Sequence, residues 1–108
     1  MTKDGKSFWR EVRGLGSLVG RHSPPKLQVE VDSQIAYQGL LVPDEESLRK
    51  TAAFYGRGPA SLEEWWEEVA TRLEDRFPEA SEVAVWGVWA GNPPARKLLG
   101  AASKEFPF

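Results

Sequence analysis

The segment from Glu82 to Ala90, EVAVWGVWA, constrains the fold of this chain more than any other feature. It is apolar on both sides of an extended backbone, so neither side suits full exposure to water. A run of this kind is typical of a central strand that is covered on each face. Its direction stays open, because parallel and antiparallel placements both fit. We therefore expect a sheet built around residues 82–90.

A β-hairpin is predicted upstream, over residues 26–42. The segment KLQVEVD alternates between apolar and polar residues, as a half-buried strand does. Asp32–Ser33 is a turn signal, and QIAYQGLLV supplies the second strand, with Ile35 and Tyr37 on one face. Pro43 ends that strand, because proline cannot donate to a strand ladder.

Helical periodicity predicts three helices and a short fourth one. Apolar residues spaced four, three and four apart indicate a helix over residues 8–19, with Ser7 as N-cap and a break near Gly14–Gly16. Asp44 caps a second helix that extends to Tyr55. On this helix we expect three residues to face inward: Leu48, Ala52 and Tyr55.

The third helix carries the clearest signals. Ser61 and Glu64 form a capping box, and Pro78 ends the helix. Its apolar stripe consists of Leu62, Trp65, Trp66, Val69, Leu73 and Phe77. A short last helix is expected over residues 95–102, after the turn Gly91-Asn92-Pro93-Pro94.

The order of elements, α-β-β-α-α-β-(α), predicts an α+β domain. We expect a small three-stranded sheet, mixed or antiparallel, that contains a β-hairpin and is packed by three to four helices. Residues 1–7 are expected to be a disordered N-terminus, and residues 8–108 a single domain.

Composition excludes several kinds of chemistry. The chain has 108 residues, no cysteine and one histidine, His22, so thiolate sites and two-histidine zinc motifs cannot form within one chain. We therefore expect no catalytic residues, no metal and no cofactor, and a protein that is not an enzyme unless a site is shared across a dimer. No secretory signal or membrane span is visible, which predicts a cytosolic protein. The scarcity of Met, Asn and Gln is typical of a heat-adapted source.

Five tryptophans are a large aromatic content for a chain of this size. Trp65 and Trp66 are adjacent on a helix, so their directions differ by about 100°. Trp86 and Trp89 lie on opposite faces of the predicted strand. Either the core is aromatic, or one face is a subunit interface. We expect a homodimer, or a complex with a protein partner, with Trp66, Trp86 and Trp89 as contact residues.

The charges are unevenly distributed. Residues 1–26 carry six basic and two acidic residues, whereas the remainder carries eight basic and fourteen acidic ones. This asymmetry supports an alternative function, the binding of nucleic acid or a phosphate ligand. The candidate residues are Arg10, Arg13, Arg21, Lys26 and Arg57. A third use of the basic segment is to complement the acidic third helix, within the chain or across a partner.

Overall fold

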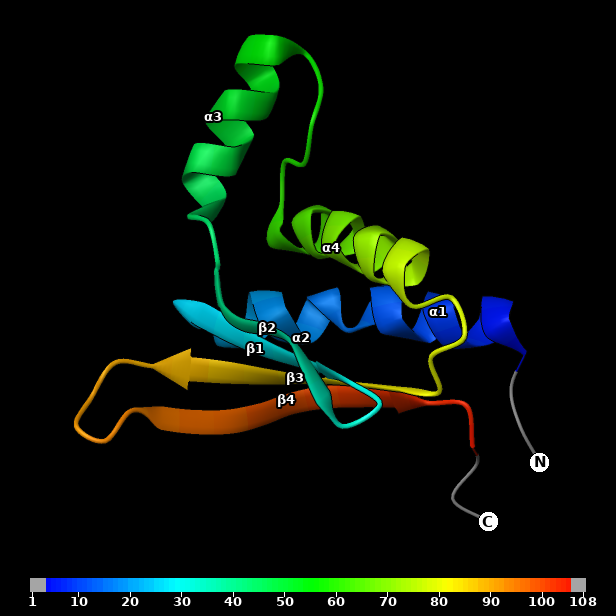
Figure 1. Cartoon of the computed structure of the whole chain (residues 1–108). Coiled ribbons are helices and arrows are strands. Elements are labelled where there is room, and N and C mark those ends of the chain that lie inside the picture. The colour runs from blue at the N-terminus through cyan, green and yellow to red at the C-terminus, as the bar shows by residue number, and fades with distance from the viewer. Residues whose placement is uncertain (1–3, 106–108) are drawn as a thin grey trace.

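The computed structural model describes residues 4–105 and has an α+β fold (Figure 1). Its elements in chain order are α1 (Gly5–Gly14), α2 (Gly16–His22), β1 (Lys26–Val31), β2 (Gln34–Leu41), α3 (Glu45–Tyr55), α4 (Leu62–Arg76), β3 (Glu82–Trp89) and β4 (Ala95–Ser103). The strands form one antiparallel sheet in the order β2-β1-β3-β4. Helices α1, α2 and α4 cover one face of the sheet, and no described element covers the other.

The predicted hairpin is confirmed in β1 and β2. Its turn consists of Asp32 and Ser33, whose φ angles of 50° and 66° match the twist of the paired strands. The carboxylate of Asp32 accepts hydrogen bonds from the N–H groups of Ser81 at 2.9 Å and Glu82 at 3.0 Å. These bonds tie the hairpin to the start of β3, which is an inner strand of the sheet as predicted. The expectation that this strand is covered on each face is wrong, because the described helices pack on one side of the sheet only (Figure 1).

Register shifts in β2 change which residues share a face. Ile35 pairs with Glu30, whereas Tyr37 pairs with Val29. Glu30 and Val29 are neighbours in β1, and their side chains point to opposite faces. Ile35 and Tyr37 are therefore on opposite faces, and the prediction that they share one is wrong.

The sheet has four strands rather than the predicted three, because residues 95–103 form β4 and not a short helix. The segment ARKLLGAAS is rich in helix formers, but it pairs with β3 along its length. A Cβ added at Gly100 would approach the side chain of Leu18 to 2.6 Å. Strand pairing and this close contact with α2 override the local helix propensity here.

Helices α1 and α2 follow one another with an interruption at Leu15, which confirms the break predicted near Gly14–Gly16. Helix α1 begins at Gly5 because the carboxylate of Asp4 accepts the N–H of Ser7 at 2.7 Å. Asp4 rather than Ser7 is thus the N-cap. Residues 5–7 belong to the first helical turn instead of a disordered segment, and residues 1–3 lie outside the described residues.

One apolar core lies between the helices and the sheet. Its fully buried larger members include Trp9, Trp66, Phe8, Leu27, Leu73, Val29 and Val85. The indole N–H of Trp66 donates to the carbonyl of Val12 at 2.8 Å, which satisfies its polar atom inside the core. Gly16 allows α2 to approach α4 closely, because a Cβ there would lie 3.2 Å from the Glu63 backbone.

Helix α3 stands away from this core (Figure 1). None of its residues is buried, and Tyr55 is 67% exposed. The prediction that Tyr55 faces inward is therefore wrong, while Leu48 and Ala52 are only partly buried. The Cα radius of gyration, 14.3 Å, exceeds the about 13 Å expected of a compact chain of this length. We call residues 44–61 the arm and the remainder the body.

Candidate interaction surface

The uncovered side of the sheet, which we call the open face, carries much of the exposed apolar surface. Residues that pair directly in an antiparallel sheet share a face, so the register defines its members. They are Lys26, Gln28, Glu30, Ile35, Leu41, Ala84, Trp86, Val88, Arg96, Leu98 and Ala101. Among the large apolar residues, Ile35, Leu41 and Leu98 are 53%, 68% and 46% exposed.

Trp86 lies in the middle of the open face, between Gln28 of β1 and Leu98 of β4. The Arg96 guanidinium stacks over its ring, 4.2 Å from the centroid, which is cation–π geometry. The indole N–H of Trp86 is shielded from water and has no hydrogen-bond partner among the described residues. The centre of the face thus combines an aromatic ring, a cation and an unused donor.

The charges of the open face are separated along the strands. One transverse row contains Leu41, Lys26, Val88 and Arg96; the next contains Gln28, Trp86 and Leu98; the third contains Ile35, Glu30, Ala84 and Ala101. Both cations lie in the first row, and Glu30 lies in the third. The face is therefore basic at one end, apolar at its centre and acidic at the other end.

The three tryptophans predicted as contact residues have different environments. Trp86 is on the open face, as described above. Trp66 is fully buried, so it cannot contact a partner in the folded chain. Trp89 is on the helical side, where its ring covers Gly87, and it lines a hollow of about 280 Å³. The sequence predicted that Trp86 and Trp89 point to opposite faces, and this is confirmed.

The five predicted anion-binding residues do not form one patch. Arg13 is engaged within the chain, because its guanidinium lies 2.6 Å from the carboxylate of Glu74 on α4. This pair matches the expected use of the basic segment against the acidic helix. Arg10 and Arg21 are exposed on α1 and α2, on the helical side. Lys26 is on the open face, and Arg57 lies in the arm.

The sequence pattern did not identify Arg96, Leu98, Ile35 and Leu41 as surface candidates. Arg96 and Leu98 were assigned to a helix, so their place opposite Val88 and Trp86 was not foreseen. Ile35 reaches the open face through the register shift of β2. The available signal was Gly100, since a glycine amid helix formers favours a close backbone approach.

Two further observations limit the chemistry within residues 4–105. The described His, Asp and Glu residues form no group of three that is arranged to hold a metal ion. None of the described helices has the length and apolar character needed to cross a bilayer.

Comparison of the chain with protein-family models, with curated proteins and with solved structures finds no match. Function is therefore inferred from the surface residues described above.

Proposed function

We propose that this protein is a non-enzymatic, cytosolic interaction module that forms a homodimer by packing two open faces together. The observation that carries the proposal is the arrangement of the open face in three rows, basic, apolar and acidic. An isologous interface must be complementary to itself. This face meets that condition for one orientation of a second copy and fails it for another.

The favoured orientation has its two-fold axis between the sheets and perpendicular to the strands. Each strand then lies over the same strand of the partner with the row order reversed. Lys26 meets the partner's Glu30, and Leu41 meets the partner's Ile35, while Trp86 and Leu98 pack near their own copies. An axis along the strands would instead bring the two basic rows together, and like charges across an interface are repulsive.

The open face spans roughly 15 Å across the strands and roughly 20 Å along them. This is the small end of specific interfaces, so the dimer is expected to be concentration-dependent. Trp86 is the central anchor, because hot spots are enriched in tryptophan and lie at interface centres. Trp89 is at most a contact at the rim of this interface, and Trp66 is not part of it because it is buried in the core.

The test is the solution mass across a range of protein concentrations, measured by sedimentation equilibrium. The chain has a mass of 12.1 kDa, and we expect Lys26→Glu alone and Glu30→Lys alone to weaken dimerisation. The double variant, Lys26→Glu with Glu30→Lys, is expected to restore it because the pair is re-formed with reversed sign. A double variant no better than the single ones would overturn this orientation.

Arg96 and Lys97 provide a matched control. They are adjacent in β4, but Arg96 pairs with Val88 on the open face and Lys97 pairs with Gly87 on the helical side. Arg96→Glu is expected to weaken the dimer about tenfold or more, which corresponds to about 1.4 kcal/mol. Lys97→Glu makes the same charge change and is expected to have no such effect. Equal effects would argue against the open face.

Nucleic-acid binding is the second candidate, and one observation favours it. An aromatic ring beside an arginine on an open sheet can stack on a single-stranded base. The predicted basic residues lie on different faces, which weakens this candidate. Binding to single-stranded oligonucleotides at about 50 mM salt, lost in Trp86→Ala and at higher salt, would favour it. No binding under those conditions would exclude it.

A further inference from the structure

The arm is an excursion whose two ends are held together on the body. The carboxylate of Glu45 accepts the N–H of Leu62, the first residue of α4, at 3.1 Å. Next to it, Glu64 accepts the N–H of Ala60 at 3.3 Å. The chain thus leaves the body at Asp44 and returns at Ser61, close to where it left. Everything between these points extends into solvent without burying a residue.

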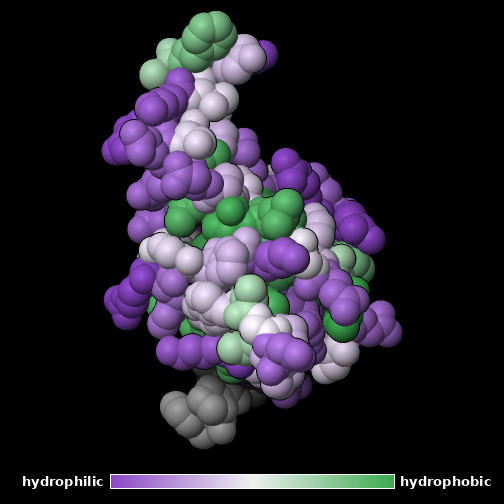
Figure 2. All heavy atoms as spheres, turned by 90° about the vertical axis from the view of Figure 1, so that its left-hand side faces the viewer, coloured by the Kyte–Doolittle hydropathy of each residue, from purple (hydrophilic) through white to green (hydrophobic). Residues whose placement is uncertain are grey.

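The energetics of this excursion are unfavourable for an isolated chain. Helix α3 has 11 residues, and helices shorter than about 12–15 residues are marginal in water without tertiary packing. Its tip exposes two aromatic rings, Phe54 at 83% and Tyr55 at 67%, stacked edge to face with centroids 5.0 Å apart. Figure 2 shows this apolar tip standing clear of the charged surface around it. An exposed aromatic pair on an otherwise unsupported helix indicates a binding element.

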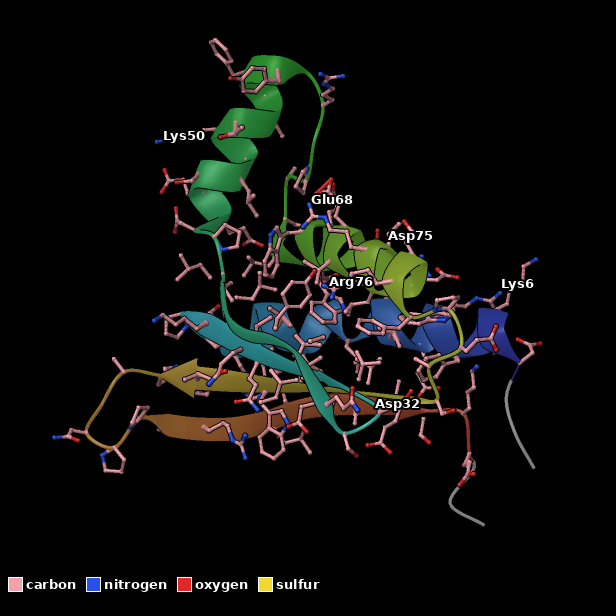
Figure 3. The ribbon with its side chains drawn as sticks, in the orientation of Figure 1. Lys6, Asp32, Lys50, Glu68, Asp75 and Arg76 are labelled. Carbon is pink, nitrogen blue, oxygen red and sulfur yellow. The ribbon has the colours of Figure 1, made fainter. Side chains whose placement is uncertain are left out.

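The arm and helix α4 have complementary charges. The outer half of the arm carries the basic residues Arg49, Lys50 and Arg57, and residues 49–58 contain no acid. The first two turns of α4 expose four carboxylates, those of Glu63, Glu64, Glu67 and Glu68. Figure 3 shows Lys50 on the outward side of α3, directed away from α4 of its own chain. Lys50 pairs with Glu46 one turn earlier on α3, with Nζ and Oε1 3.4 Å apart, but both side chains are largely exposed. A second molecule can therefore still reach the basic side of the arm.

A hollow separates the arm from α4. It has a volume of about 520 Å³ and is lined by Tyr55, Arg57, Gly58 and Glu68. In Figure 3, Glu68 lies on the side of α4 below the loop that leaves the arm. The hollow thus has an aromatic wall from the arm and an acidic wall from α4, and it is wide enough for an aromatic side chain.

We propose that the occupant of this hollow is the arm tip of a second copy of this chain, with Phe54 inserted between the partner's arm and α4. The exchange is reciprocal, because each copy supplies one aromatic tip beside basic residues and one hollow whose α4 wall is acidic. Arg49 and Lys50 of one copy then lie against the carboxylates of the other. This interface is separate from the open face and does not depend on it. A chain that uses both interfaces assembles beyond a dimer.

The absence of cysteine allows a direct test by site-specific crosslinking. One preparation carries Ala53→Cys, which leaves Phe54 intact. A second preparation of different tagged mass carries Arg72→Cys, one turn beyond Glu68 on α4, which leaves the acidic wall of the hollow intact. Both also carry Leu98→Glu, which disrupts the open face, so that failure of one proposal is distinguishable from failure of the other. A short bismaleimide is expected to link the two preparations into a heterodimer. Crosslinked homodimers of one preparation alone, or no crosslink at all, would overturn the proposal.

A second measurement follows arm association without cysteines. In the Leu98→Glu background, Phe54→Ala is expected to weaken self-association at least about tenfold, as a hot-spot truncation does. Glu79→Ala, which truncates an exposed side chain outside the arm, the hollow and the open face, is the control and is expected to change nothing. Because the interface also uses charge, association is expected to fall between about 0.1 M and 1 M salt. Association unaffected by Phe54→Ala would contradict the exchange.

Discussion

Helices α4 and α3 differ in what holds them in place, although both begin in the same way. Ser61 caps α4 and Asp44 caps α3, and both helices have two acidic residues in the first turn. Helix α4 buries Leu62, Trp66, Val69, Ala70 and Leu73, whereas α3 buries no residue. Capping and dipole interactions thus define where a helix begins, but burial provides most of its stability. The body supplies that burial to α4, whereas α3 lacks it within the single chain.

The largest expected effect is a loss of folding stability when a buried aromatic residue of the body is truncated, compared with an exposed one of the arm. Trp66→Ala is expected to lower the free energy of unfolding by about 3–5 kcal/mol, because it leaves a cavity and removes the bond to Val12. Phe54→Ala is expected to change that free energy by no more than about 0.5 kcal/mol. Urea denaturation at low protein concentration measures both. Similar losses for the two variants would mean that the arm is packed like the body.

The close packing of α2 against α4 can be tested at Gly16. Gly16→Val is expected to lower the free energy of unfolding by about 1–3 kcal/mol, because the new atoms press on the backbone of α4. Gly14→Ala is the control at a helical site, since a Cβ there meets nothing within 4 Å. It is expected to raise stability by about 0.5–1 kcal/mol. Thermal unfolding of both variants gives the comparison, and a harmless Gly16→Val would contradict close α2–α4 packing.

Amide hydrogen exchange tests the same contrast without substitution. In the monomer, amides of α3 are expected to exchange through low-energy local opening, while those of the middle of α4 require nearly global unfolding. The protection factors of the α4 amides are expected to exceed those of the α3 amides at least about 100-fold, which corresponds to about 2.8 kcal/mol. At high protein concentration, protection of α3 should rise as the arms find partners. Strong protection of α3 in the monomer would contradict its description as an unsupported helix.

The smallest expected effect concerns the cap of α1. The N–H of Ser7, helped by the Ser7 side chain, lowers the pKa of the fully exposed Asp4 carboxyl below its ordinary value of 3.8. The stabilisation is therefore present above the unfolded pKa and is lost as the pH falls through the lower folded pKa. The protection of the first-turn amides of α1, taken relative to the intrinsic exchange rate at each pH, should fall on acidification below about pH 4. Asp4→Asn retains an oxygen acceptor and should remove this pH dependence.

Local patterns predicted the elements whose signals lie within a few residues. The Asp32–Ser33 turn, the Ser61 N-cap and the apolar run of β3 were all found where the sequence indicated them. The predicted capping box is only half formed, because the Glu64 carboxylate accepts the N–H of Ala60 and not that of Ser61. Helix wheels could not tell which of Trp65 and Trp66 points inward, because both border the apolar stripe. Among the predicted site residues only Lys26 and Trp86 lie on the open face, since the positions of Arg96, Leu98 and Ile35 depend on β4 and on the shifted register of β2.

The sequence by itself determined the α+β class, the hairpin, the N-caps of α3 and α4, and the opposite directions of Trp86 and Trp89. These follow from spacing, turn residues and caps, which act between neighbours in the chain. Only the tertiary structure decided that residues 95–103 are a strand, that Trp66 is buried and that the side of α3 expected to face inward is not buried against the body. The reason is that strand pairing and burial join residues distant in sequence. The free energy of such contacts exceeds the differences in intrinsic helix or strand propensity between residues.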